Sequence, residues 1–223
     1  MTRDQLGPGP LSRVRRLPKK AAYDSKTIYS ILDEARFCHV SGIVNGRAMA
    51  LPTLHAREGD VLYLHGSQSN ALMRSIVERG EASITVTLYD GLRLARSGFE
   101  SSVAYRSAVV FGAVSIVDDP QEKLRILETF VDAVLPGRSQ EVRSTSEQEL
   151  RLTLVVAVSI DEASAKVSAG PTDDPEEDLE LPIWSGTVPA RLVFEAPIPT
   201  RNGAMVTGDI ELPGSVRALL ERS

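Results

Sequence analysis

The chain has 223 residues, 42% of them hydrophobic, and its 30 acidic against 25 basic residues leave a net charge of −5 at pH 7. This length and apolar content predict one folded domain with a tail and exclude disorder of the whole chain. The acidic excess disfavours a general nucleic-acid-binding surface.

Cysteine usage and the spread of apolar residues indicate where the protein works. The single cysteine, Cys38, excludes an internal disulfide framework and is typical of a reducing compartment. No apolar run approaches the roughly 20 residues that span a bilayer, and the first 20 residues lack the apolar stretch of a signal peptide. We therefore expect a cytoplasmic protein with neither a membrane nor a nucleic acid as partner.

The first 20 residues are predicted to form an extended N-terminal arm. They contain Pro8, Pro10 and Pro18, and five basic residues lie between Arg13 and Lys20. Such an arm is either a solvated leader or a segment that lies across a partner subunit. We expect the main domain over 21–194 and a C-terminal extension over 195–223.

Helix and strand signals follow the arm. Asp24 or Ser25 can cap a helix over 26–35, and Asn45-Gly46 is a hairpin signal between strands 37–44 and 47–55. Gly59-Asp60 turns into a strand over 61–65, and a helix with one apolar face is expected over 70–79.

Strands also dominate the second half. A strand over 82–89, a second hairpin turn at Asp90-Gly91, and strands over 92–97 and 106–117 are predicted. Asp118 or Asp119 caps a helix that ends at Pro136-Gly137, and a strand over 152–160 is expected to pair with 163–168. An exposed acidic loop over 173–180 and a short helix over 215–221 complete the chain.

These elements predict a fold class. Many short strands joined by Asn-Gly and Asp-Gly turns favour an antiparallel sheet that closes on itself, with two or three helices over its open ends. Repeated βαβ units are absent from the pattern, which argues against a Rossmann-type parallel sheet. The expected class is mainly β with helices (α+β).

Most familiar catalytic and metal-binding patterns are missing. His39, His55 and His65 and the one cysteine show no metal-binding spacing, so no metal site is predicted. The sequence lacks a Gly-x-Ser-x-Gly elbow and the Gly-rich phosphate loops, and no side chain is identified as a catalytic acid, base or nucleophile.

The segment 63–70 (YLHGSQSN) is the strongest candidate for binding chemistry. A strand ends there and a helix begins, and free backbone N–H groups at a helix start favour an anion. Ser67 and Ser69 add hydroxyl groups, and Arg74 lies one turn into the helix. The alternative is an ordinary helix cap made by Ser67 or Ser69.

Two further segments carry groups that suit a phosphorylated aromatic ligand. Arg106 and Ser107 stand at the start of a long apolar strand and could meet a phosphate, or Arg106 could simply extend to water. Trp184, the single tryptophan, is either a core side chain or a contact for a flat aromatic ligand.

Taken together, these stretches resemble the FMN-binding split-barrel proteins related to pyridoxamine 5′-phosphate oxidase, in the branch that includes the nitroimidazole-resistance proteins. The matching stretches keep the family's order and spacing over about residues 15–190; they are 36–40 (RFCHV), 50–55 (ALPTLH), 60–67 (DVLYLHGS), 83–97 (SITVTLYDGLRLARS), 105–112 (YRSAVVFG), 136–138 (PGR), 165–166 (AK) and 181–189 (LPIWSGTVP).

The resemblance implies an antiparallel split β-barrel and a homodimer with two FMN sites at the subunit interface. By the same resemblance, Pro52 and Thr53 lie along the flavin ring, and His65, Gly66 and Ser67 line the ring or its ribityl chain. Ser69 faces the phosphate, Arg106 and Ser107 come from a neighbouring strand, and Trp184 approaches from the other subunit.

This chain departs from the family pattern at the phosphate. Relatives carry an arginine or lysine just after the serine-rich turn, where this sequence has Ala71 and Leu72. Glu100 and Ala104 likewise replace a histidine and an asparagine. Arg74 or Arg106 is expected to supply the missing positive charge.

The expected function is that of a flavin-dependent oxidoreductase that acts on a small molecule, with NAD(P)H as a candidate electron donor. One alternative is a flavin-binding module without enzymatic activity. Another is haem binding or degradation, in which His39, His55 or His65 would ligate iron.

Overall fold

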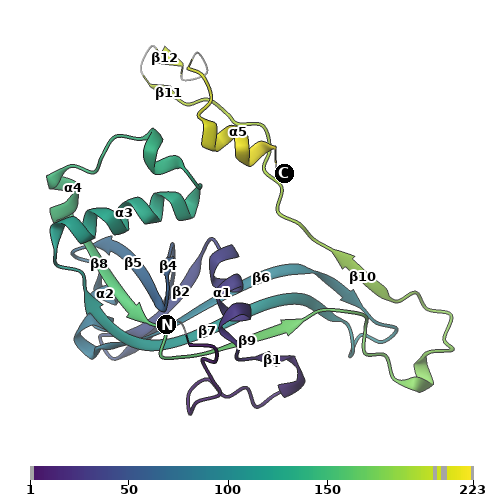
Figure 1. The fold of residues 1–223 in the computed structure, drawn as a ribbon. Coiled ribbons are helices and arrows are strands. Elements are labelled where there is room, and N and C mark those ends of the chain that lie inside the picture. Colours follow the sequence, from purple (N-terminus) through teal and green to yellow (C-terminus); the bar gives the residue numbers. More distant parts are fainter. Residues whose placement is uncertain (1–2, 203–204, 207–209, 222–223) are drawn as a thin grey trace.

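The computed structural model describes residues 3–202, 205–206 and 210–221, and these form an open antiparallel sheet with helices packed around it (Figure 1). The helices are α1 (Ser25–Glu34), α2 (Ala71–Arg79), α3 (Pro120–Val134), α4 (Glu147–Leu152) and α5 (Gly214–Leu220). The strands are β1 (Ala21–Ala22), β2 (Cys38–Val44), β3 (Arg47–Thr53), β4 (Ala56–Glu58), β5 (Val61–Ser67), β6 (Glu81–Leu94), β7 (Ser102–Ile116), β8 (Thr153–Ser159), β9 (Glu162–Ser168), β10 (Gly186–Pro189), β11 (Arg201–Asn202) and β12 (Met205–Val206).

The main sheet is a split barrel of ten strands. Its hydrogen-bonded path runs β3-β2-β6-β7-β8-β5-β4, with β9 beside β7 and β1, and β10 beside β6. The antiparallel α+β prediction is confirmed. The expectation that the sheet closes on itself is wrong, because β3 and β4 end the path and are joined only by the short connection through Leu54 and His55.

Side-chain caps explain where three helices begin, and the sequence predicted two of them, at α1 and α3. Asp24 accepts a hydrogen bond from the Thr27 N–H at the start of α1, and Asp119 does the same for Glu122 at the start of α3. Asn70 caps α2. The sequence prediction missed α4, which starts with a capping box made by Ser146 and Glu149.

Asp90-Gly91 is not a hairpin turn. Strand β6 continues through it to Leu94, and the pairing with β7 shifts by one residue between Tyr89 and Gly91, which is a β-bulge. Gly91 has φ 141, and a Cβ there would lie 2.2 Å from the Val188 carbonyl oxygen. The glycine therefore permits the close approach of β10 rather than a chain reversal.

Segment 163–168 pairs with β7 and not with 152–160 as predicted. The 15 residues of β7 are long enough for two partners on one edge: Tyr105 to Phe111 pair with β9, and Val114 to Ile116 pair with β8. Gly112 stands between the two stretches. A Cβ on Gly112 would lie 1.5 Å from the Ser159 carbonyl oxygen. The connection from β8 to β9 can therefore pass this point only because residue 112 has no side chain.

The N-terminal arm lies against its own chain. Leu6 is buried, its N–H donates to the Tyr23 carbonyl, and its carbonyl accepts from the Ala163 N–H. The N–H groups of Leu11 and Ser12 both donate to the Glu162 carboxylate at 3.1 Å. The solvated-leader interpretation is therefore wrong around Leu6, Leu11 and Ser12, whose backbone groups find partners elsewhere in the chain, whereas most of residues 13–20 are exposed.

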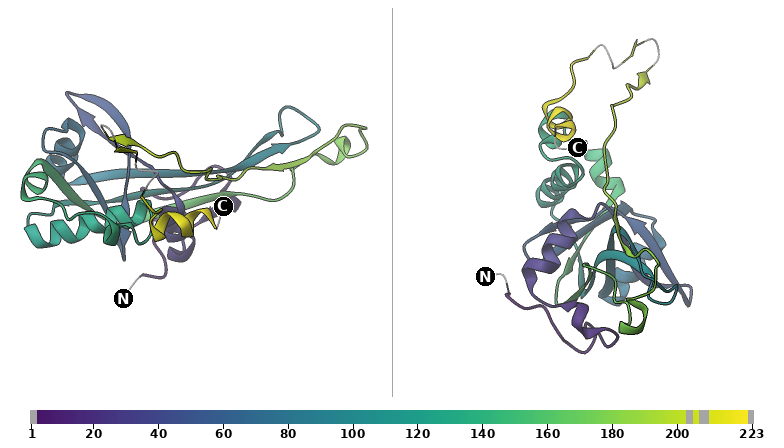
Figure 2. Two further views of the ribbon diagram at one scale, coloured as in Figure 1. Left: turned by 90° about the horizontal axis from the view of Figure 1, so that it is seen from above. Right: turned by 90° about the vertical axis from the view of Figure 1, so that its right-hand side faces the viewer.

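The acidic loop is only partly exposed. The Asp174 carboxylate is 4% exposed and accepts hydrogen bonds from the Arg96 backbone N–H and guanidinium, and Asp173 lies 3.5 Å from the buried Arg93. These pairs tie the loop before β10 to the end of the long β6–β7 hairpin, which projects from the barrel in Figure 2.

The core has two parts. The larger cluster fills the barrel and is covered by α1 and α2, with Ile28, Leu64 and Ile84 fully buried. The smaller cluster lies under α3 and joins Ile126 and Phe130 to Val155. Cys38 begins β2, is fully buried, and its burial raises the pKa of the thiol to about 12. No helix in the described part of the chain is long and apolar enough to cross a bilayer.

Gly112→Ala is expected to destabilise the fold by more than about 3 kcal/mol, because the new methyl group would meet a backbone oxygen that cannot move without breaking the β7–β8 pairing. Urea denaturation measures the effect. Gly98→Ala is the matched control, since nothing lies within 4 Å of a Cβ at that position. Equal stability of the two variants would contradict this account of the sheet corner.

Candidate functional site

The turn between β5 and α2 presents two serine hydroxyls that the helix does not use. Asn70 caps α2 through its side-chain oxygen, which accepts from the Met73 N–H at 3.1 Å, so the alternative of a serine cap is wrong. The Ser67 and Ser69 hydroxyl oxygens lie 2.9 Å apart, and the Ser69 N–H donates to the Ser67 hydroxyl. Both side chains are exposed and within reach of a ligand.

Arg74 fixes the shape of this serine turn. Its Nε donates to the Gln68 carbonyl oxygen at 2.6 Å, and the Gln68 side chain donates to the Thr153 carbonyl oxygen. Arg74 is thereby bound to the same turn that carries the two hydroxyls. Such a combination of one cation and two hydroxyl donors suits an anion with several oxygens, and phosphate is the common example.

Arg106 is held by two carboxylates of its own chain. Its guanidinium donates to both Glu34 oxygens at 2.5 and 2.8 Å and to both Asp90 oxygens at 2.8 and 3.0 Å. The hydrogen bonds to Glu34, and then those to Asp90, raise the pKa of Arg106 far above its ordinary value. A phosphate could reach Arg106 only by displacing one of these carboxylates, which makes Arg74 the better cation for the serine turn.

The remaining predicted site residues lie on separate elements. Pro52 and Thr53 end the edge strand β3, opposite His39 and Cys38 of β2. His65, next to Gly66 on β5, is half-buried, and its ring meets Phe130 of α3 edge-on with 4.4 Å between centroids. Ser107, on β7, lies 3.5 Å from the Lys166 carbonyl oxygen.

Trp184 is not a core residue. It is 66% exposed on the loop before β10, at the hairpin end of the molecule, whereas the serine turn lies beside α2 at the other end of the barrel (Figure 1). Within one chain the structure therefore gathers Ser67, Ser69 and Arg74, and it leaves the Arg106, Pro52 and Trp184 groups elsewhere.

Sequence reasoning missed a cavity of about 660 Å³ beside His55. It lies between the end of α1, the connection from β3 to β4, α3 and the C-terminal extension. Most of its wall is apolar; the lining includes Leu32, Ala35, Phe37, Leu54, Ala56, Ala133, Val134, Leu135, Leu192, Phe194 and Leu219. The only local signal was His55 itself, because the other walls come from distant parts of the sequence.

His55 lines this cavity together with five other polar residues that are hydrogen-bonded within the chain, namely Asp33, Arg36, Arg57, Thr129 and Asp132. Its side chain is 6% exposed, and Nε2 lies 2.8 Å from the Leu32 carbonyl oxygen, to which it donates as N–H. Nδ1 is buried and has no hydrogen-bond partner within the described residues. Burial lowers the pKa of His55, and the bond to Leu32 opposes this only in part. A neutral imidazole whose other nitrogen is held by a carbonyl is the usual form of a metal-ligating histidine.

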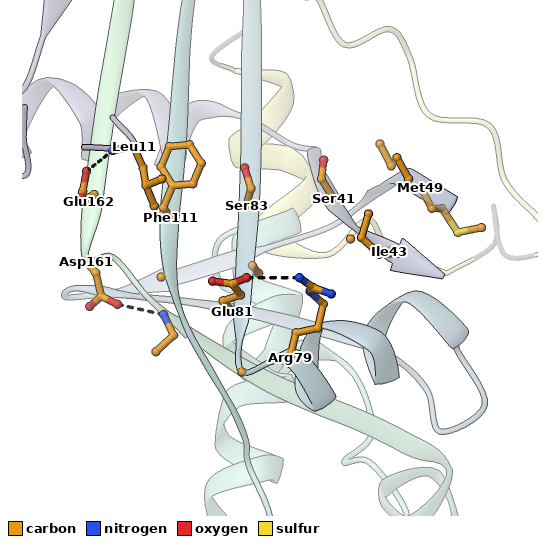
Figure 3. Close-up of a pocket in the computed structure, with 17 residues that line it drawn as sticks. Leu11, Ser41, Ile43, Met49, Arg79, Glu81, Ser83, Phe111, Asp161 and Glu162 are labelled. Carbon is orange, nitrogen blue, oxygen red and sulfur yellow. Dashed lines mark hydrogen bonds and ion pairs between the residues drawn. The ribbon is translucent and has the colours of Figure 1, made fainter. Parts of the chain in front are cut away.

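A larger open groove of about 840 Å³ crosses the outer face of β2, β3, β6 and β7 (Figure 3). Leu11, Ile43, Met49 and Phe111 stand around it, and Arg79 and Glu81 form an ion pair of 3.8 Å on its rim. Strand β3 is exposed on both faces for almost its whole length. No group of three or more potential metal ligands occurs among the residues that the structure describes.

The fold and these surfaces define a split-barrel protein of the α+β class. Comparison with sequence families matches residues 24–167 to the family described as pyridoxamine 5′-phosphate oxidase. The chain therefore belongs to the pyridoxamine 5′-phosphate oxidase family. No curated protein matches it in sequence.

Three solved structures are similar. The flavocytochrome Anf3 from Azotobacter vinelandii is 33% identical, with 95% of this chain and 97% of that chain covered and a TM-score of 0.85. The FAD- and haem-binding protein from Mycobacterium smegmatis is 34% identical over 90% and 97%, with a TM-score of 0.82. A proposed 5-nitroimidazole antibiotic resistance protein from Bacteroides thetaiotaomicron is 25% identical over 66% and 86%, with a TM-score of 0.57.

The buried His55 predicts an acid-sensitive fold. Because its pKa is below 6.5 in the folded chain, the unfolded chain takes up a proton first as the pH falls through 6.5, and stability is lost below that pH. His55→Gln, which keeps an N–H donor for Leu32, is expected to reduce the loss of unfolding free energy between pH 7.5 and 5.5. Urea titrations at both pH values measure it. Between pH 7.5 and 8.5 the two proteins should show the same change, and identical acid slopes would contradict the prediction.

Proposed function

We propose that this protein is a flavin-binding oxidoreductase that acts on a small molecule. The observation that carries the proposal is the serine turn, in which the Ser67 and Ser69 hydroxyls are exposed and do not cap α2, and to which Arg74 is bound through the Gln68 carbonyl oxygen. The family supports it, as do two neighbours at 33% and 34% identity that are described as a flavocytochrome and as an FAD- and haem-binding protein.

The residues of the turn fit the first phosphate of a flavin nucleotide. That phosphate carries a charge of about −1.5 to −2 in FMN and needs several donors. Ala71 and Leu72 offer none through their side chains, so Ser67, Ser69 and Arg74 take over the contact. The sequence resemblance indicates FMN, whereas FAD, which has the same first phosphate, is the flavin named for the Mycobacterium smegmatis protein.

The chain's own groups would position the flavin. Pro52 and Thr53 would lie along its ring, and His65 and Gly66 would line the ring or the ribityl chain. A bound flavin would supply two-electron transfer between the substrate and a donor such as NAD(P)H. We assign no side chain as acid or base.

We also propose a homodimer. An edge strand with both faces and one edge uncovered is a template for association, and β3 with Met49 and Leu51 exposed has this form. The open groove beside β3 continues the same face. In such a dimer Trp184 of one subunit would approach the flavin of the other, as the family resemblance implies.

Haem binding is the second candidate, and the His55 cavity favours it. A flat apolar ring system fits an apolar space of about 660 Å³, and the unpartnered Nδ1 of the buried His55 can ligate iron. Both neighbours at 33% and 34% identity have a cytochrome or haem in their descriptions. His39, exposed on β2, has no comparable surroundings.

The flavin proposal is tested on purified protein. We expect a yellow protein whose extracted flavin is FMN or FAD by mass, and whose colour is bleached by NAD(P)H if the protein is an oxidoreductase. Ser67→Ala with Ser69→Ala, and separately Arg74→Ala, should weaken flavin binding at least about tenfold, the effect of losing one charge-assisted hydrogen bond.

Two controls accompany these variants. Ser144→Ala removes an exposed serine before α4 and should leave flavin affinity unchanged. Arg106→Ala should lower the thermal midpoint more than the flavin affinity, because it breaks the link to Glu34 and Asp90. Unchanged affinity in both serine-turn variants would overturn the phosphate assignment, and flavin binding without bleaching by any donor would favour the non-enzymatic module.

The haem proposal is tested by adding haemin to the purified protein and recording the Soret band. We expect stoichiometric binding, and His55→Gln should weaken it at least about tenfold, since the iron–nitrogen bond is lost. His39→Gln is the matched control. The same spectrum and affinity in His55→Gln as in the unaltered protein would exclude His55 as the ligand.

A further inference from the structure

The chain after β10 leaves the barrel and comes back to it. Residues 190–200 contain no helix or strand, and α5 then lies on the α3 side of the molecule (Figures 1 and 2). Three side chains of this segment line the His55 cavity, namely Leu192, Phe194 and Leu219. The family match ends at residue 167, so this wall is built from outside the family's common part.

A specific contact holds the returning end in place. The Ser215 backbone N–H donates to one Glu141 carboxylate oxygen at 2.9 Å, and its hydroxyl donates to the other at 2.5 Å. Glu141 belongs to the short 3-10 helix Arg138–Glu141 that follows α3. The Ser215 hydroxyl, and then its N–H, lower the pKa of Glu141, so the carboxylate stays charged and keeps accepting both bonds.

The apolar side chains of this wall are incompletely covered by their own chain. Leu192 is 75% exposed and Phe194 38% exposed, although both stand at the cavity. A ring-shaped ligand in the cavity would cover part of this area and remove it from water. The two neighbours at 33% and 34% identity are aligned over 95% and 90% of this chain, so their alignments include most of the segment beyond residue 167.

We propose that residues 190–200 and 210–221 contribute the outer wall of the His55 cavity, through Leu192, Phe194 and Leu219, and determine how long it retains a flat apolar ring ligand. The Ser215–Glu141 contact would hold this wall in place. The proposal rests on the second candidate function, in which the ring is haem. Leu192 and Phe194 are the side chains that would cover the ring from the solvent side, and the Ser215–Glu141 contact keeps α5, with Leu219, at the same cavity.

The test is the rate at which haem leaves the full-length protein for an excess of apomyoglobin. Leu192→Ser with Phe194→Ser should raise this rate at least about tenfold, and Glu141→Ala should raise it in the same direction because the Ser215–Glu141 contact is lost. Val193→Ser is the matched control, since Val193 is equally apolar and 63% exposed but does not line the cavity. Flavin affinity should be the same in all four proteins.

The possible results distinguish a failure of the wall proposal from a failure of the haem proposal. If the unaltered protein binds haem and the double variant releases it no faster than Val193→Ser, the wall proposal is overturned and the haem proposal stands. If the unaltered protein binds no haem, the haem proposal fails, and the wall is tested with the fluorescent ring compound 1-anilinonaphthalene-8-sulfonate, whose binding should drop in the double variant alone. Loss of the dimer by light scattering, without a change in either ligand, would mean that these side chains cover a second copy and would overturn the proposal.

Discussion

Strand β7 hydrogen-bonds to β6 along one edge and must share its other edge between β9 and β8. The exchange of partners takes place at Gly112, where the Ser159 carbonyl leaves no room for a side chain. Because β8 then pairs with β5, this one corner directs β5 and the serine turn away from the β6–β7 hairpin. The split in the barrel, and the space that α3 covers, follow from the same exchange.

Local chemistry made several elements predictable from the sequence. Asp24 and Asp119 cap helices as expected, and Asn45-Gly46 joins β2 to β3. Asp90-Gly91 misled the prediction because a bulge and a hairpin turn require the same permissive glycine, and only the distant strand β10 distinguishes them. The partner of β9 was equally unreadable, since strand pairing depends on contacts far apart in sequence.

The candidate site likewise has parts that the local sequence predicts and parts that it does not. Ser67, Ser69 and Arg74 are close in sequence and lie on or next to one turn, so their neighbourhood follows from the local chain, whereas their role as a binding group stays a prediction. The two carboxylates that hold Arg106 come from α1 and from the bulge in β6, so no local sequence pattern predicts their pairing with Arg106. The cavity at His55 needs α1, α3 and the C-terminal extension together. Residues that come together only in the tertiary fold are far apart in sequence, so no local sequence pattern predicts their contact.

The buried Cys38 has a practical consequence for experiments on this molecule. Its thiol is held in β2 between β3 and β6, has no exposed surface, and stays protonated at neutral pH because burial raises its pKa to about 12. Alkylating reagents attack the thiolate, so they can modify this chain only during the moments when the sheet opens. The rate at which this single cysteine is alkylated therefore reports how often the barrel opens, and no further cysteine has to be introduced to measure it.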